Sequence, residues 1–566
     1  MRNVFMAAAA LGTIAAVLAA PDEARAAECL LDTNNDGDAD SNVDTTGGAN
    51  DQDDSESLAC GSASSANSNN TNADGAVAIG SFANSTGAGA LAIGNDVNAT
   101  GDGALAVGGD ADSNGYGLTS ATANGASAIG VGADAIAVNS TAVGSLANAT
   151  QAGAIAIGNE SDATGNSSIA IGGDALDADS LGAQATGGES VAIGADASSA
   201  GNDSVALGHG ANTTGVAGGS VAIGRLASTQ NFQAVAIGQA ASATGDRSAA
   251  LGAGAAANGN FSTAVGTGAN SAGNISTAVG TGSSAGGNLS SAFGRNANAA
   301  GAESISVGNL SDATQDGAIA IGGDSTEDGD EDGAQATGER AIAIGADALS
   351  SARDSLALGR SARATAVSAV AIGVDSQATA NGALAVGERS NAALNATALG
   401  KDTVAGQSAV AAGIEANAAV AAIAVGERAA AASSGIAIGK DSNSGSRAVA
   451  SGIEANASGT SSISVGDTSA ASGLNSIALG AGTVSSGNGS VAIGGDGNDS
   501  NTIGARATQD RASAFGADAQ ATGVNATAVG NRALASRSGS AAFGVIARAT
   551  GNNSTAVGNS ALVSGG

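Results

Sequence analysis

The residues best suited to hold a metal ion lie close together near the start of the chain. Ca²⁺ binds roughly six to eight oxygen atoms, and the chain must turn tightly around the ion. Five oxygen-bearing side chains stand at every second position around a glycine, namely Asp32, Asn34, Asp36, Asp38 and Asp40. This spacing is similar to that of EF-hand and thrombospondin-type calcium loops, although Val43 occupies the position where a bidentate Glu is expected. We interpret the segment either as a calcium site or as a solvated acidic spacer.

Two cysteines, Cys29 and Cys60, flank this acidic segment, and the chain has no others. An export signal precedes them, because Arg2 is followed by an apolar run over residues 5–20 and by a small-x-small cleavage site at 24–26. Exported proteins meet oxidising conditions, in which paired cysteines form disulfides. We therefore expect export and a disulfide between the two cysteines.

The remaining composition disfavours enzymatic chemistry and nucleic-acid binding. The only histidine is His209, so a site with several histidines is excluded and any histidine-based triad has to use this residue. His209 follows Gly208 among small polar residues and is interpreted as a surface residue without a role. Lys and Arg number 19 against 51 Asp and Glu, which gives a net charge of -32 and opposes contact with a phosphate backbone. We predict no enzyme activity and no nucleic-acid partner.

A short repeat takes over from residue 71. The segment Ala76-Val77-Ala78-Ile79-Gly80 returns in about 33 rungs, most of them about 14 residues apart. A short fixed period is typical of a solenoid, in which each unit buries its apolar face against its neighbours. The predicted domains are a signal peptide at 1–26, an acidic N-terminal segment at 27–70 and the repeats at 71–566.

Alternation within each rung predicts strands. Val77 and Ile79 share one face and Ala76 and Ala78 the other, which is a period of two. A helix is the alternative, because Ala is the best helix former. The helical alternative is strongest over residues 404–434, where glycines are few. Glycines close every rung and would cost a helix about 1 kcal/mol each. The sequence therefore predicts two short strands and two turns per coil, in an all-β parallel solenoid.

The same alternation suggests which residues are buried. We expect each coil to bury its two larger aliphatic side chains and to direct Ala faces, such as that of Ala76 and Ala78, toward sister chains. Phe293, Phe515 and Phe543, which stand in the place of an aliphatic residue before the closing glycine, are interpreted as core variants. Burial of so little apolar surface in each coil barely offsets the conformational entropy that the chain loses on folding. We therefore expect an obligate oligomer.

The repeat resembles the head domain of trimeric autotransporter adhesins, the YadA-like head, whose signature is close to N-S-V-A-I-G. The quoted motifs are carried by Val77, Ile79 and Gly80, by Val205, Leu207 and Gly208, by Val221, Ile223 and Gly224, and by Ile477, Leu479 and Gly480. The resemblance covers about residues 71–566. It implies a left-handed β-roll that forms a homotrimer on a Gram-negative surface and binds host matrix, host cells or other bacteria.

The resemblance leaves the attachment to a surface open. Adhesins of this kind continue into a heptad stalk and a membrane anchor, and neither pattern is found in the sequence. Release into the medium, a longer reading frame and a separate anchoring protein are the alternatives. The expected location is the cell surface, the outer membrane or the extracellular medium.

Four long rungs are the candidates for specificity. Insertions of about eight residues follow the glycines at 108, 172, 322 and 494, and insertions of a solenoid emerge on one face that often binds a partner. The acidic insertion at 324–332 is interpreted as a site for Ca²⁺ or a basic partner, or as a solvated loop. An extracellular matrix or fibre protein without a specific ligand is the alternative function, and a solenoid that binds ice or a mineral surface is a third.

Overall fold

The computed structural model describes residues 57–66, 75–109, 117–175, 181–214, 218–325, 332–497 and 503–565. The chain divides into two compact units, Met1–Asn274 and Ile275–Gly566. The predicted signal peptide, the calcium loop from Asp32 to Asp40, and Cys29 lie outside the described residues. Cys60 is described, but its pairing with Cys29 stays a prediction.

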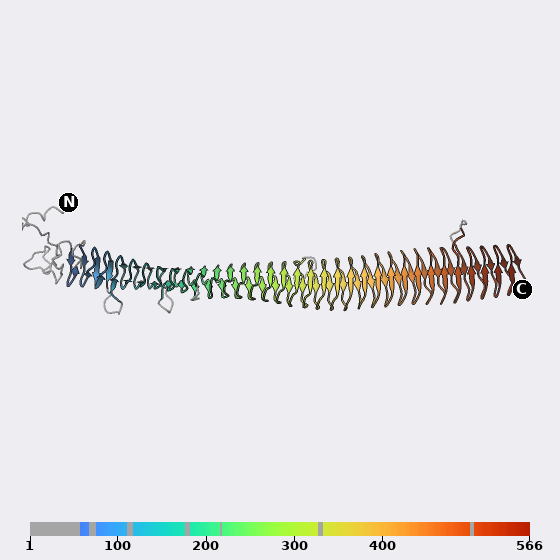
Figure 1. Cartoon of the computed structure of the whole chain (residues 1–566), viewed down its shortest axis with the longest axis horizontal. Coiled ribbons are helices and arrows are strands. Elements are labelled where there is room, and N and C mark those ends of the chain that lie inside the picture. The colour runs from blue at the N-terminus through green and yellow to red at the C-terminus, as the bar shows by residue number, and fades with distance from the viewer. Residues whose placement is uncertain are drawn as a thin grey trace, which may run out of the picture. The chain divides into compact units, whose positions relative to one another are not determined.

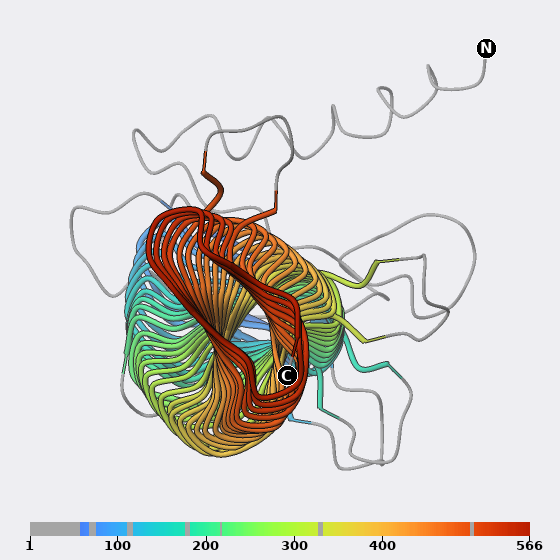
Figure 2. The same cartoon turned by 90° about the vertical axis from the view of Figure 1, so that its right-hand side faces the viewer.

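Both units are built from one kind of coil, which consists of a three-residue strand, a turn, a two-residue strand and a second turn. β3 (Val77–Ile79) and β4 (Asn84–Ser85) form one such coil, and β5 (Leu91–Asn95) begins the next. The first unit runs from β1 (Leu58–Cys60) and β2 (Ser65–Ala66) to β27 (Thr263–Val265) and β28 (Asn270–Ser271). The second unit runs from β29 (Thr277–Val279) and β30 (Ser284–Ala285) to β67 (Thr555–Val557) and β68 (Leu562–Val563). Its last coils appear in red in Figure 2 as flattened loops.

Within each unit the odd-numbered strands form one parallel sheet and the even-numbered strands a second. Pairing is in register, so that equivalent residues of successive coils stack: Val77 pairs with Leu91, Ala78 with Ala92 and Ile79 with Ile93. Figure 1 shows the strands of each unit side by side across the direction of stacking. The predicted all-β parallel solenoid is thereby confirmed.

The helical alternative over residues 404–434 is wrong. That stretch holds strands from β46 (Val404–Ala405) to β50 (Ala430–Ala431), and the described residues as a whole contain no helix. Over those same residues there is accordingly no helical segment long and apolar enough to cross a bilayer.

The coils begin earlier in the chain than the sequence predicts. β1 and β2 already form a coil at residues 58–66, ahead of the predicted boundary at residue 71.

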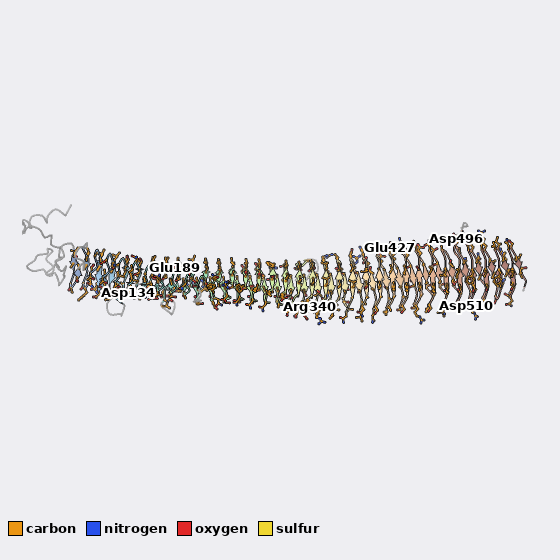
Figure 3. The ribbon with its side chains drawn as sticks, viewed as in Figure 1. Asp134, Glu189, Arg340, Glu427, Asp496 and Asp510 are labelled. Atoms are coloured by element: carbon orange, nitrogen blue, oxygen red, sulfur yellow. The ribbon has the colours of Figure 1, made fainter. Side chains whose placement is uncertain are left out.

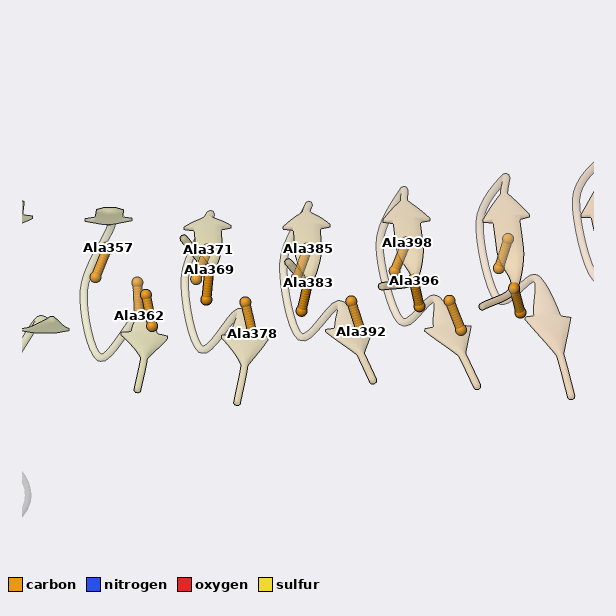
Figure 4. Packing of buried hydrophobic residues seen from close by; sticks show 14 of the residues in the cluster. Ala357, Ala362, Ala369, Ala371, Ala378, Ala383, Ala385, Ala392, Ala396 and Ala398 are labelled. Carbon is orange, nitrogen blue, oxygen red and sulfur yellow. The ribbon is translucent and has the colours of Figure 1, made fainter. Parts of the chain in front are cut away.

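The interior of the coil consists mainly of alanine, with serine, threonine and Val97 among the other inward residues. Ala76, Ala78, Ala83 and Ala90 are at most 1% exposed, and most of their equivalents along both units are buried too. Figure 4 shows such alanines in the second unit, where Ala357, Ala371 and Ala385 extend from one sheet toward the other. The prediction that Ala76 and Ala78 face sister chains is therefore wrong.

The larger aliphatic residues point outward instead. Val77 is half-buried and Ile79 is 39% exposed, which reverses the predicted orientation. The reason is steric, because the two sheets of so short a coil approach closely, and the largest fully buried side chains are no bigger than valine. Phe293, Phe515 and Phe543 occupy the outward position too and are about 40% exposed, so their interpretation as core residues is also wrong.

The closing glycine of each coil allows this close stacking. Gly80 has a φ of 134°, in a region that side chains rarely adopt, and a Cβ on it would lie 2.1 Å from the carbonyl oxygen of Gly94. Gly94 meets Gly108 in the same way. The glycines thus form a column at the end of the first sheet, and each one is required by the backbone of the next coil.

Candidate interaction surfaces

The described residues hold no cluster that resembles a metal centre. No group of three or more His, Cys, Asp or Glu side chains converges within them. His209 lies in a turn with its side chain about half exposed, and its Nε2 is 3.8 Å from Oδ2 of Asp196. The surfaces left to consider are the outer faces of the two sheets and the turns.

The outer face of the first sheet is apolar, and we call it the apolar stripe. It consists of the first and third residues of the odd-numbered strands. In the first unit the third residue is 37 to 40% exposed in many coils, including Ile79, Ile129, Ile157, Leu207, Ile237 and Leu251. All the motif residues other than glycine lie on this stripe, in β3, in β19 (Val205–Leu207), in β21 (Val221–Ile223) and in β57 (Ile477–Leu479).

The motif glycines have a structural role. Gly80, Gly208, Gly224 and Gly480 all have φ between 127° and 134°, and each stands in the column described above. A Cβ on Gly208 would lie 2.7 Å from the carbonyl oxygen of Gly224. These glycines therefore set the close stacking that aligns the apolar stripe, and they offer no side chain to a partner.

The outer face of the second sheet is polar in the first unit, and we call it the polar ladder. It contains Asn84 in β4, Asn98 in β6 (Val97–Ala99), Asp134 in β10 (Asp134–Ala135) and Asp162 in β14 (Asp162–Ala163). Asn84 donates a hydrogen bond from Nδ2 to Oδ1 of Asn98 over 2.8 Å. Stacked neighbours partly desolvate the carboxyls, and this burial raises the pKa of Asp134 and, against the effect of a hydrogen bond with Asn148, that of Asp162.

Among the described residues, three long rungs are anchored in one way. The residue after Gly-Gly-Asp donates its backbone N–H to an aspartate of the following coil. Ala175 donates to Oδ1 of Asp196 over 3.1 Å, Ser325 to Oδ1 of Asp347 over 3.0 Å, and Gly497 to Oδ1 of Asp518 over 3.0 Å. The hydroxyl of Ser325 also donates to Asp347.

Sequence reasoning missed the structural role of these anchoring aspartates. Their signal is a Gly-Ala-Asp triplet in the rung after the insertion, at Gly194, Gly345 and Gly516. The insertions always leave the turn that follows a first-sheet strand, as between β35 (Ile319–Ile321) and β36 (Gln335–Ala336). Most of the acidic insertion at 324–332, residues 326–331, lies outside the described residues, so its predicted partner stays untested.

Ion pairs link turns of successive coils in the second unit. Oδ1 of Asp354 lies 2.7 Å from Nε of Arg340, Oδ1 of Asp402 lies 2.6 Å from Nε of Arg389, and Oδ1 of Asp441 lies 2.6 Å from Nε of Arg428. The hydrogen bond from each arginine is the main cause that lowers the pKa of its aspartate. Figure 3 labels Arg340 and Glu427 at the outer edge of the coils.

Comparison with known proteins gives one result. The model of the family described as YadA head domain repeat (2 copies) matches fourteen segments, some of them overlapping, that together cover more than half of the chain. They lie at residues 72–96, 135–161, 149–175, 185–211, 199–227, 231–255, 285–311, 299–325, 336–362, 364–390, 444–469, 471–496, 507–533 and 535–561. A search of curated proteins finds no match.

Proposed function

The chain belongs to the family of YadA head domain repeats, and from this premise we propose that it is a non-enzymatic adhesin head. It attaches its bearer to host matrix, to host cells or to other bacteria. Its functional form is a homotrimer of left-handed coils. It is exported and acts at the cell surface, on the outer membrane or in the extracellular medium.

The apolar stripe carries this proposal. Monomeric soluble proteins seldom expose continuous apolar patches of more than a few hundred Å², and longer patches mark surfaces that associate. Here Ile or Leu recurs at the exposed third position of coil after coil, as at Ile129, Ile157 and Leu207. Association of copies along the stripe removes the exposed part of these side chains from water, and each Å² of apolar surface removed contributes about 25 cal/mol.

In-register stacking favours copies of the same chain as the partner. Equivalent residues of successive coils pair directly, as Ile155 does with Ile169, so the stripe has the same repeat in every copy. Copies that lie parallel therefore match coil for coil along their length. A closed trimer buries all three stripes against one another and leaves none exposed.

Adhesion is then assigned to the surfaces outside the stripe. The polar ladder and the turns repeat with the coils, so a weak contact is multiplied along the chain and again by three. Many identical weak contacts suit attachment to large or repetitive ligands. They suit enzymatic turnover poorly, because that requires one preorganised site.

The absolute mass of residues 27–566 in solution tests the proposal. Light scattering after size exclusion is expected to give three chains per particle, and beads coated with this protein are expected to show saturable binding to extracellular matrix. A monomeric particle would contradict the trimer. Open-ended filaments without saturable binding would favour the alternative of a structural fibre.

Matched variants test the role of the stripe. Replacing Ile129, Ile157 and Leu207 together by Asp is expected to lower the mass below that of a trimer, because burial of three charges per chain is costly. The control replaces Gln151, Gln230 and Gln239 by Asp, which adds the same charge at exposed positions outside the stripe. Equal masses for the two variants would place the interface elsewhere.

A further inference from the structure

One turn of the first unit stacks an arginine between two aromatic rings. Phe232 precedes β23 (Val235–Ile237), Arg247 precedes β25 (Ala249–Leu251), and Phe261 precedes β27, so the three residues occupy the same turn of successive coils. The Cζ atom of Arg247 lies 5.2 Å from the ring centroid of Phe232 and 5.4 Å from that of Phe261. Both distances are within the range of cation–π contacts.

The backbone of the coils fixes this stack. The N–H of Arg247 donates to the carbonyl oxygen of Phe232 over 2.8 Å, and the N–H of Phe261 donates to that of Asp246 over 2.7 Å. The Nε of Arg247 donates to Oε1 of Gln233 over 3.3 Å. The guanidinium is therefore held in place, and its two Nη groups make no hydrogen bond or ion pair with any other described residue.

Comparison with Arg340 shows what is unusual about Arg247. Arg340 occupies the equivalent turn position in the second unit and pairs with Glu339 and Asp354. Arg247 has Asp246 as its neighbour in the chain but forms no ion pair within the described part of the structure. In a chain with a net charge of -32, a fixed arginine without a carboxylate partner is a group that can bind an anionic ligand.

The surroundings indicate what kind of anion fits. Phe261 is 51% exposed and offers a flat apolar face. Asn260 uses its Oδ1 to accept from the N–H of Asp246, and Gln233 uses its Oε1 to accept from Arg247, so both amides keep an NH₂ group as a donor in the same turn of the coils. An apolar face beside several donors suits a sugar ring that carries a carboxylate.

We propose that Phe232, Arg247 and Phe261 form a binding site for an acidic sugar residue at the end of a glycan. The C–H face of the sugar packs on Phe261, its carboxylate accepts from the Nη groups of Arg247, and its hydroxyls accept from Gln233 and Asn260. One exposed ring and a few amides are too small for a protein interface, which needs about 800 Å² on each partner. The negative net charge disfavours long polyanions over a single terminal carboxylate. The site rests on the proposed adhesive function and names a ligand class for it.

Titration of residues 27–566 with 3′-sialyllactose, and with lactose as its neutral counterpart, tests the site. We expect a dissociation constant of about 1 mM or below for the acidic sugar and binding at least about tenfold weaker for lactose. Equal binding of the two sugars, or no binding of the acidic sugar at several times this concentration, would overturn the proposal.

Three variants separate this site from a general charge effect. Arg247→Gln is expected to weaken binding of the acidic sugar about tenfold or more, and Phe261→Leu about threefold or more. Arg225→Gln removes the same charge from an exposed turn of the same unit and is expected to leave binding within about twofold. The proposal fails if Arg247→Gln behaves like Arg225→Gln.

A second measurement distinguishes failure of the sugar site from failure of the adhesin proposal. Light scattering and binding of coated beads to matrix are measured on the same variants. Arg247→Gln is expected to keep the mass of the parent protein, because Arg247 lies in a turn outside the apolar stripe. Loss of sugar binding with unchanged mass supports the site, whereas a parent protein that binds matrix but no sugar leaves the adhesin head standing and removes the site.

Discussion

Gly94 lies directly against Gly108 of the next coil, and a Cβ on Gly94 would lie 1.7 Å from the Gly108 carbonyl oxygen. Real Cβ atoms do not approach an oxygen so closely, so any other residue at Gly94 forces the two coils apart. The φ of 131° at Gly94 adds conformational strain for a residue with a side chain. A backbone contact therefore accounts for the glycine that closes each motif.

Replacement of Gly94 by Ala is expected to destabilise the protein strongly. The separated coils lose parallel pairing between β5 and β7 (Leu105–Gly109), and the loss is about 3 kcal/mol or more. Gly103→Ala is the matched control, because Gly103 also has a positive φ but its Cβ would meet no atom within 4 Å. The control should cost about 1 to 2 kcal/mol. Thermal unfolding followed by circular dichroism measures both, and equal losses would contradict the backbone contact.

Enlarging the interior of the coil is expected to be more harmful than truncating its outer face. Ala156 is fully buried between the sheets, so Ala156→Leu overpacks the coil and costs about 1 to 3 kcal/mol or more. Ile155 points outward in the same strand, β13 (Ile155–Ile157), and Ile155→Ala leaves the interior unchanged.

The measurement for this pair is chemical unfolding of the two variants under conditions in which the parent protein is monomeric. Association through the apolar stripe would otherwise add a cost for Ile155→Ala that does not arise within the coil. If Ile155→Ala proves the more damaging change in the monomer, the aliphatic residues are inside after all.

The period of the repeat was enough to predict the strands, their parallel stacking and the turns. Pairs such as Ala78 with Ala92 follow directly from a fixed repeat of 14 residues, because equal spacing brings equivalent residues together. The same period indicated that the glycines lie in the turns. These features depend only on the local pattern of residues, which can be read from a single sequence.

The direction of the two faces could not be predicted from alternation, since a period of two is unchanged when the faces are exchanged. The general preference for burying large aliphatic residues then led to the wrong face for Val77 and Ile79. The deciding quantity is the separation of the two sheets. The sequence did hold a clue to this separation. Ala83 and Ala90, which also point inward, are small, and small residues on the inner faces of both sheets indicate that the sheets lie too close together to enclose Ile79.

The candidate sites depend on contacts between turns of different coils. Such contacts are harder to predict from the sequence than the strands or the direction of their faces. Asp347 holds Ser325 from the coil beyond an insertion, and the distance in sequence between them hides the relation. Likewise Phe232, Arg247 and Phe261 occur at nearly equal spacing, but only the register of the turns places the guanidinium between the two rings.

Removal of an anchoring aspartate is expected to loosen the base of its insertion. Asp347→Ala eliminates the acceptor for the N–H and the hydroxyl of Ser325, so hydrogen exchange at Ser325 should accelerate by about tenfold, which corresponds to about 1.4 kcal/mol. Exchange followed by mass spectrometry of peptides measures this change. Asp375→Ala, in a turn without an insertion, serves as the control and should leave Ser325 unchanged. Equal protection of Ser325 in the parent and the Asp347 variant would show that the anchor does not hold the insertion.

Asp134 is expected to make stability fall as the pH rises. Its neighbours in the polar ladder, Ser120 in β8 (Thr119–Ala121) and Asn148 in β12 (Asn148–Ala149), are uncharged, and burial raises the pKa of Asp134 in the folded protein. A carboxyl whose pKa is raised on folding binds its proton more tightly in the folded state. Its contribution to stability is therefore complete below the pKa of the unfolded chain, about 3.9, and is lost as the pH rises through the folded value.

Asp134→Asn removes that loss. The variant is expected to melt at a higher temperature than the parent at about pH 7, and the difference should shrink to nothing at about pH 3, where Asp134 is protonated in both states. Asp354→Asn is expected to show the opposite pH dependence. A hydrogen bond from Arg340 lowers the pKa of Asp354, so the stabilising effect of the Asp354 carboxylate is present at neutral pH and lost in acid. Melting curves of the three proteins across this range measure both effects. A difference between the Asp134 variant and the parent that stays constant with pH would show that burial of the carboxylate is not its cause.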